Sequence, residues 1–147
     1  MKDRYIYPAF FCHYEDGIIG IIFPDLPGCV SQGDSDEDAL RMAKEVLALH
    51  LWGMEEDADE TPAPTPVKQL KPESDQVVVL IEAFMPSIRE KMNKKAVTKT
   101  VTIPRWLEVE AKAANINCSR VLQEGLMSRL EVNPKTRSKK TAKKSAI

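Results

Sequence analysis

The first third of the chain alternates between apolar and polar positions in the manner of short β-strands. Residues 4–14 are rich in Tyr, Ile and Phe, although Pro8 within them indicates an edge position or a bulge. An Asp-Gly turn at residues 16–17 leads into a second apolar run at residues 18–23, and this pair of runs predicts a hairpin. After a turn with two prolines and a glycine, residues 29–32 predict a third short strand.

The apolar spacing then changes to that of a helix. Ser35 is a typical N-cap, and Asp38 stands at the capping-box position three residues later. Apolar residues recur three and four positions apart up to about Met54, which predicts one amphipathic helix. An acidic run and a Thr-Pro repeat end it, so residues 57–75 predict an extended connector. Residues 77–84 are apolar almost without interruption, which predicts a buried strand.

These elements follow one another in the order β-β-β-α-β. An amphipathic helix of this length covers one face of such a sheet and closes a small core. We therefore expect residues 1–85 to form an α+β domain. Because the segment is short, self-association would add to its stability.

The rest of the chain predicts a second, smaller unit. Residues 86–94 predict a linker helix, and residues 96–103 alternate threonine with mostly apolar residues, which indicates a strand. Two helices are expected after Pro104, separated by Asn115, a residue that often ends a helix in the left-handed conformation. The second of these helices begins at Asn117 or the residue after it and ends before an Asn-Pro pair.

One strand and two helices over residues 95–133 are too small to bury a core alone. We expect an intertwined dimer in which two antiparallel strands pair above four helices, and such a ribbon fits the DNA major groove. If Val101 and Ile103 face inward, the alternation of a strand turns the threonines outward. The predicted contacts with DNA bases are therefore Thr98, Thr100 and Thr102. The predicted contacts with a DNA phosphate, at the start of the last helix, are Asn117, Cys118 and Ser119.

Charge divides the 147-residue chain in the same way. Residues 1–66 carry four basic and fourteen acidic side chains, whereas residues 67–147 carry seventeen basic and eight acidic ones. An acidic surface favours basic protein partners, and a basic one favours nucleic acid. Residues 134–147 hold six of the basic residues and no acid, and we expect them to form a disordered tail.

Several classes of protein are disfavoured by the composition. No apolar run approaches the roughly 18 residues of a membrane span, and the N-terminus does not resemble a signal peptide. Three cysteines without close spacing disfavour a disulfide framework or structural zinc and suit the cytoplasm. We expect Cys12 and Cys29 to be small core residues, while Cys118 at a helix start is the more reactive candidate.

Catalytic chemistry has little support. Three acids, Asp16, Asp25 and Asp34, lie at expected turns, and nothing in the sequence places them together as metal-dependent nuclease chemistry requires. His13 and His50 have no ligand-spaced neighbour, so we interpret both as packing residues. We expect no enzyme activity, no cofactor and no metal.

Motifs in both halves resemble one protein family. The front half resembles HicB antitoxins in Phe23-Pro24-Asp25-Leu26-Pro27-Gly28-Cys29, in Gly33-Asp34 and in Glu37-x-Ala39-Leu40. The rear half resembles the Arc/MetJ type of ribbon-helix-helix in Val101-Thr102-Ile103-Pro104 and Ile116-Asn117-x-Ser119-Arg120. It departs from that pattern at Asn115, where glycine is usual, and at Lys99, where an apolar residue is usual.

This resemblance implies a fold and a function. The front domain would be a degenerate ribonuclease-H-like fold that binds and blocks HicA, a small mRNA-cleaving toxin. The rear domain would be a ribbon-helix-helix dimer that binds operator DNA and represses its own operon. Two alternatives stay open: a stand-alone regulator whose front domain senses a ligand or a protein, and a residual nuclease.

Overall fold

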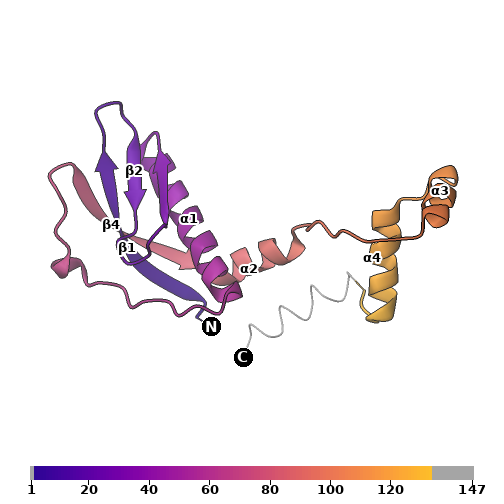
Figure 1. Cartoon of the computed structure of the whole chain (residues 1–147). Helices are drawn as coiled ribbons and strands as arrows, with labels where there is room; N and C mark the ends of the chain where they lie inside the picture. The colour runs from indigo at the N-terminus through magenta and orange to yellow at the C-terminus, as the bar shows by residue number, and fades with distance from the viewer. Residues whose placement is uncertain (1, 134–147) are drawn as a thin grey trace. The chain divides into compact units, whose positions relative to one another are not determined.

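The described residues, 2–133, divide into two units between Val97 and Thr98 in the computed structural model (Figure 1). The first unit contains the sheet and its covering helices, and the second contains two short helices. Each unit is considered by itself below. The tail predicted at residues 134–147 lies outside the described residues.

The first unit follows the predicted β-β-β-α-β order, and a further helix continues directly from its last strand. Its elements are β1 (Arg4–His13), β2 (Ile19–Ile22), β3 (Val30–Gly33), α1 (Asp36–Glu56), the 3-10 turn η1 (Val67–Gln69), β4 (Gln76–Phe84) and α2 (Met85–Lys94). The four strands form one antiparallel sheet in the order β3-β2-β1-β4. The first strand is thus central, and it pairs with β4 from Arg4 opposite Phe84 to Cys12 opposite Gln76.

Helix α1 begins where the capping pattern places it. The Ser35 hydroxyl oxygen accepts a hydrogen bond from the Asp38 N–H at 3.1 Å. The Asp38 carboxylate in turn accepts from the N–H of Asp34, one residue before the cap. The helix ends at Glu56, two residues beyond the predicted end.

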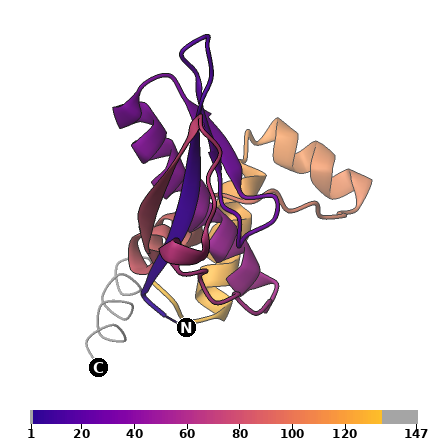
Figure 2. The same cartoon turned by 90° about the vertical axis from the view of Figure 1, so that its left-hand side faces the viewer.

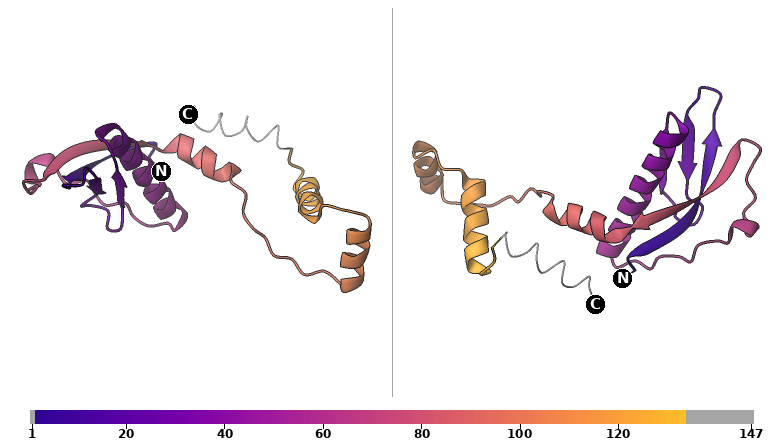
Figure 3. Two further views of the ribbon diagram at one scale, coloured as in Figure 1. Left: turned by 90° about the horizontal axis from the view of Figure 1, so that it is seen from above. Right: turned by 180° about the vertical axis from the view of Figure 1, so that it is seen from behind.

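Helix α1 lies against one face of the sheet (Figure 2 and Figure 3), and the buried side chains of the core lie between them. The helix presents a stripe of small and aliphatic residues that are fully buried, namely Ala39, Ala43, Leu47 and Leu51. The facing sheet residues are mainly large, and they include Tyr7, Phe11, Ile21 and Ile81. Alanines in the first turns allow the helix to lie close to the sheet, where Gly33 meets the Ala39 backbone.

The strand predicted at residues 77–84 is present, but it is buried on one face only. In β4, Ile81 and Ala83 are buried beneath α1, whereas Leu80 and Phe84 on the opposite face are 57% and 49% exposed. An apolar run indicates burial but does not say what covers each face. This strand lies at the end of an antiparallel sheet, so its side chains are covered by α1 on one side only.

The second unit contains α3 (Arg105–Ala113) and α4 (Cys118–Arg129). Asn115 between them has a φ of 54°, the left-handed conformation predicted for it. The Asn117 side-chain oxygen accepts a hydrogen bond from the Arg120 N–H at 3.1 Å, which confirms Asn117 as the N-cap of α4.

The predicted strand at residues 96–103 is absent from the single chain. Residues 96–104 form neither helix nor strand. A strand exists only through hydrogen bonds to a neighbouring strand, and the described part of this chain offers none there. The alternation of threonine and apolar residues therefore does not form a β-strand without a partner strand.

Candidate functional site

The second unit has no core of its own. No side chain among residues 98–133 is buried, and only Ala111, Leu122 and Met127 are even partly covered. Val101 and Ile103, which we expected to face inward, are 54% and 41% exposed. Trp106 is 67% exposed. An apolar surface of this extent is stable in water only when another molecule covers it.

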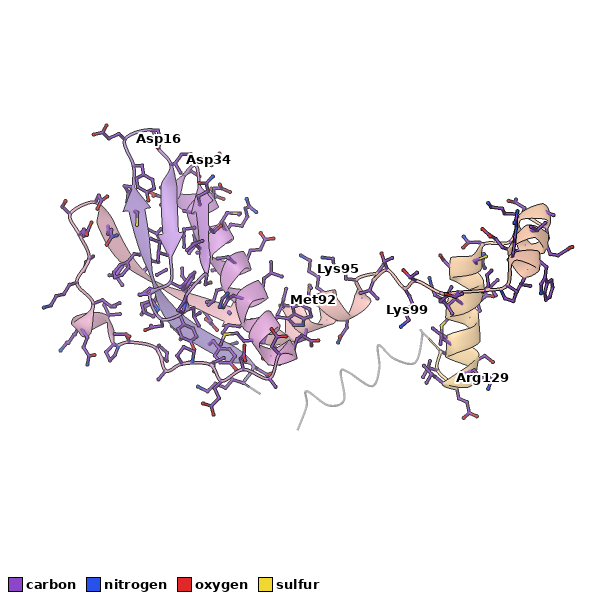
Figure 4. The ribbon with its side chains drawn as sticks, in the orientation of Figure 1. Asp16, Asp34, Met92, Lys95, Lys99 and Arg129 are labelled. Atoms are coloured by element: carbon purple, nitrogen blue, oxygen red, sulfur yellow. The ribbon has the colours of Figure 1, made fainter. Side chains whose placement is uncertain are left out.

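The three threonines proposed to contact bases lie at the start of the second unit, before α3. Thr98, Thr100 and Thr102 are all exposed, as is Lys99 among them, which Figure 4 labels. The single chain thus leaves all three hydroxyl groups accessible.

The residues proposed to contact a phosphate lie at the start of α4. The side-chain oxygen of Asn117 is already occupied by the Arg120 N–H. Cys118 and Ser119 belong to the first turn of the helix, whose N–H groups have no acceptor within the helix itself. These backbone groups, next to the exposed Cys118 thiol, are available to donate to a phosphate.

The Pro-Asp-Leu-Pro-Gly turn is fixed to the core of the first unit. Leu26 and Cys29 are buried, and the Cys29 N–H donates to the Leu26 carbonyl at 3.0 Å. Gly28 has a φ of 84°, a conformation that favours glycine. Burial raises the pKa of the Cys29 thiol to about 11, so the group stays protonated near neutrality.

Two side chains of the first unit hold the connector that follows α1. The Asp25 carboxylate accepts hydrogen bonds from the N–H and the hydroxyl of Thr65, at 2.9 and 2.5 Å. The Tyr7 hydroxyl donates to the Pro62 carbonyl at 2.5 Å. Its pKa is raised, chiefly because burial disfavours the phenolate. Hydrogen bonds from Asp25 and Tyr7 therefore fix the connector, which has little regular structure, to the first unit.

Gly33 is required where β3 meets the helix. A Cβ atom at this position would stand 2.5 Å from the Ala39 backbone nitrogen, too close for any side chain. Within the front-half motif, Pro24, Asp25, Leu26, Pro27, Gly28 and Gly33 thus lie around one turn and one strand end of the first unit.

Within residues 2–133, the three aspartates expected at turns do not come together as a metal site. Figure 4 shows Asp16 and Asp34 at the same end of the sheet, while Asp25 is bound to Thr65. No group of three or more His, Cys, Asp or Glu residues within the described part of the chain could hold a metal ion. Cys12 and Cys29 are buried, as predicted.

The interpretation of His13 as a packing residue is wrong. Its side chain is 46% exposed, and its Nε2 atom lies 3.7 Å from Asp36 Oδ1. His13 is the last residue of β1, so it projects at the end of the sheet beyond the core. His50 is partly buried on α1, which agrees with a packing role.

An ion-pair cluster that the sequence did not reveal anchors α2. The Arg89 guanidinium donates to both carboxylate oxygens of Glu55, at 2.9 and 2.6 Å, and also to Asp3 and to the Lys2 carbonyl. The Arg89 and Glu55 side chains are only 20% and 9% exposed. These partners lie 34 and more residues away along the chain, so no local pattern indicates them.

Charge differs between the two units. Residues 1–97 contain ten basic and eighteen acidic side chains, a net charge of −8. Residues 98–147 contain eleven basic and four acidic ones, a net charge of +7. The net charge of the first unit therefore suits a basic partner, and that of the second unit suits a polyanion.

Comparisons with known proteins define the class of this two-unit protein. Residues 7–124 match the family model described as HicB-like antitoxin of bacterial toxin–antitoxin systems. A 14.9 kDa protein from the rep-hol intergenic region of Haemophilus phage HP1 is 33% identical over 96 residues, which cover 63% of this chain and 71% of that protein. Antitoxin HicB 1 of Photorhabdus laumondii is 38% identical over 63 residues, or 43% of this chain and 41% of the antitoxin.

Solved structures share the fold. A chain of a toxin–antitoxin complex from Streptococcus pneumoniae aligns with a TM-score of 0.56 at 22% identity, covering 86% of this chain and 99% of that one. The Burkholderia pseudomallei antitoxin HicB aligns with a TM-score of 0.50 at 20% identity, covering 86% and 98%. At this level of identity the likeness concerns the fold alone.

The chain belongs to the HicB-like antitoxin family of bacterial toxin–antitoxin systems. It is therefore a non-enzymatic regulator, which agrees with the expectation from its sequence. None of the helices within residues 2–133 has the length and apolar character of a membrane span.

Proposed function

We propose that this antitoxin neutralises a HicA-like mRNA-cleaving toxin through its first unit and represses its own operon through its second. The observation that carries the DNA-binding half is the absence of a core among residues 98–133. We infer that a second copy supplies it, by pairing residues 96–103 of both chains as an antiparallel ribbon above four helices. This arrangement is a ribbon-helix-helix dimer.

The dimer would explain the exposed apolar residues of the single chain. Val101 and Ile103 of each copy would then face the helices, where Trp106, Val121 and Leu126 are now exposed. Thr98, Thr100 and Thr102 would face the major groove, and the first turn of α4 would contact a phosphate.

The acidic first unit supports the toxin-binding half of the proposal. An RNA-cleaving toxin has to bind a polyanion, so its working surface is basic and complementary to a net charge of −8. We place toxin binding on the domain of residues 1–85, and we take this domain to be a degenerate ribonuclease-H-like fold. Residues 86–94 would link it to the DNA-binding domain at residues 95–133, and the cytoplasm is the expected compartment.

A single substitution separates the two activities. Replacing Thr100 with alanine should lower operator affinity by roughly tenfold, because one base contact per strand is lost. Toxin binding should be unchanged, since the first unit is intact. Fluorescence anisotropy with operator DNA and co-purification with the neighbouring gene product measure the two activities, with Ser74→Ala in the first unit as control. Equal loss of both activities would refute the division of labour.

The alternative of a stand-alone regulator predicts a different result. Such a protein would bind DNA through the same ribbon but would retain no small basic protein during purification. A pull-down of the tagged chain at its native locus distinguishes the two, because an antitoxin retains its toxin in near-equal amounts.

A further inference from the structure

Basic side chains of the first unit gather at its C-terminal end. Residues 89–95 contain four basic side chains and one acidic one, whereas residues 2–88 contain six basic and seventeen acidic side chains. Lys91 and Lys95 are exposed, and neither is paired with a carboxylate within residues 2–133. Lys95, labelled in Figure 4, directly follows α2. This end of the unit is thus locally positive, although the unit as a whole is acidic.

A groove of about 650 Å³ beside α1, α2 and β4 adds a third lysine to this surface. Its charged lining consists of Arg4, Arg41, Lys44, Glu45, Glu82 and Lys91. Each carboxylate has an arginine beside it, Glu82 at 3.1 Å from Arg4 and Glu45 at 3.7 Å from Arg41. Lys44 and Lys91 have no such partner in the described part of the chain, so their charges remain available to an anion.

The helix that carries Lys91 is held in place by the core of the first unit. Met85 in its first turn is fully buried, and the Met85 N–H donates to the Asp3 carbonyl at 2.8 Å. Ile88 packs against the core, and Arg89 is bound in the ion-pair cluster described above. A charged group on a fixed helix loses less conformational freedom on binding than one on a free segment. The backbone position of Lys91 is therefore set before any ligand binds.

The chain itself keeps this surface close to the proposed DNA contacts. Lys95 precedes Thr98 by three residues, and an extended chain spans at most about 3.6 Å per residue. The two Cα atoms are therefore within about 11 Å of each other, or roughly three base pairs of duplex, and phosphates beside the contacted bases are within reach. Acidic side chains farther away in the unit are screened beyond about 8–10 Å at physiological salt.

We propose that Lys44, Lys91 and Lys95 contact the phosphate backbone of DNA beside the operator bases, so that the acidic first unit also takes part in DNA binding. A lysine suits this role because its ammonium group binds phosphate as a point charge. Such contacts add affinity and fix the register of the protein on the duplex without reading sequence. The proposal rests on the operator binding proposed for the second unit.

A double substitution with a matched control tests these contacts through the salt dependence of binding. The full-length Lys91→Ala/Lys95→Ala variant should lose about 1.8 from the magnitude of the log–log salt slope, at about 0.9 per contact. Adding Lys44→Ala should remove about 0.9 more. Lys68→Ala/Lys71→Ala removes the same charge from exposed positions of the connector and should keep the slope of the unmodified protein. Anisotropy titrations with a duplex from the region upstream of the gene measure all four slopes.

Ethylation interference locates the same contacts on this duplex. Ethylation of phosphates at the outer ends of the bound site should weaken binding of the unmodified protein and should have no effect on the Lys91→Ala/Lys95→Ala variant. The connector variant should show the interference pattern of the unmodified protein.

Four outcomes would count against the proposal. A Lys91→Ala/Lys95→Ala variant whose slope and interference pattern match those of the connector variant overturns it. An unchanged slope on adding Lys44→Ala excludes the groove from the contact. If the double variant keeps its slope but no longer retains the toxin, these lysines bind protein and the proposal is wrong. If the unmodified protein binds no DNA from this region, the proposed operator binding is itself wrong, and this proposal with it.

Discussion

The structure explains why particular residue types stand at three positions of the front-half motif, Asp25, Gly28 and Gly33. Gly28 has a positive φ, and Gly33 allows the start of α1 to approach β3. Asp25 binds a connector residue 40 positions later in the sequence. The sequence marks these positions as an unusual cluster of Pro, Asp and Gly, but it does not show that Thr65 is the partner of Asp25.

The hydrogen bonds between Asp25 and Thr65 can be tested through the stability of the protein. Replacing Asp25 with alanine removes two hydrogen bonds to a charged acceptor, so the free energy of unfolding should fall by about 2 kcal/mol. Urea denaturation followed by circular dichroism measures this change. Glu15→Ala, on an exposed turn, serves as control and should leave the midpoint unchanged. Equal urea midpoints for both variants would mean that the Asp25–Thr65 hydrogen bonds do not form in solution.

Local signals predicted α1 well because its determinants are local. The Ser35 cap and the stripe of buried alanines and leucines are properties of neighbouring residues. The exposed face of β4 and the unpaired state of residues 96–104 depend on which segments lie alongside. Periodicity in one segment contains no information about its neighbours, so it did not show that β4 is covered on one face only or that residues 96–103 have no partner strand within the single chain.

Helix α2 is attached to the rest of the first unit by the Arg89 cluster and by Met85 and Ile88, which pack in and against the core. Replacing Arg89 with methionine leaves the Glu55 carboxylate, 9% exposed, without its cation. The free energy of unfolding should fall by about 3 kcal/mol, because a largely buried charge loses its partner. Thermal or urea unfolding of the full chain measures this loss.

Two further variants make this prediction specific. Adding Glu55→Leu to Arg89→Met should recover much of the lost stability, since the unpaired charge is removed. Lys94→Ala, which breaks the exposed Lys94–Glu90 pair on the same helix, should have no measurable effect. A loss of similar size for Lys94→Ala would contradict an anchoring role for Arg89.

At the scale of the whole molecule, the first unit is acidic and the second is basic. The salt dependence of DNA binding shows how many basic residues contact DNA phosphates. Residues 98–133 hold five basic and four acidic side chains, whereas residues 134–147 hold six basic ones and no acid. If the tail contacts phosphates, operator affinity should fall steeply with salt, by a log–log slope of about −0.9 per phosphate contacted. Deleting residues 134–147 should flatten that slope.

A pair of connector lysines provides the control for the salt experiment. Replacing Lys68 and Lys71 with alanine removes two charges from the first unit and should leave the slope as it was. Anisotropy titrations over a range of salt concentrations give all three slopes. A slope unaffected by the tail deletion would assign the phosphate contacts to residues outside the tail.

The sequence by itself determined the order of elements, the caps of α1 and α4, the left-handed Asn115 and the opposed charges, because each depends on residues close together in the chain. The family resemblance was equally visible, since motifs are local. Only the tertiary structure decided that β4 is an open edge, that Asp25 holds the connector and that Arg89 anchors α2. It also showed that residues 98–133 lack a core. These features arise from contacts between distant segments, or from their absence, and no spacing along the chain encodes them.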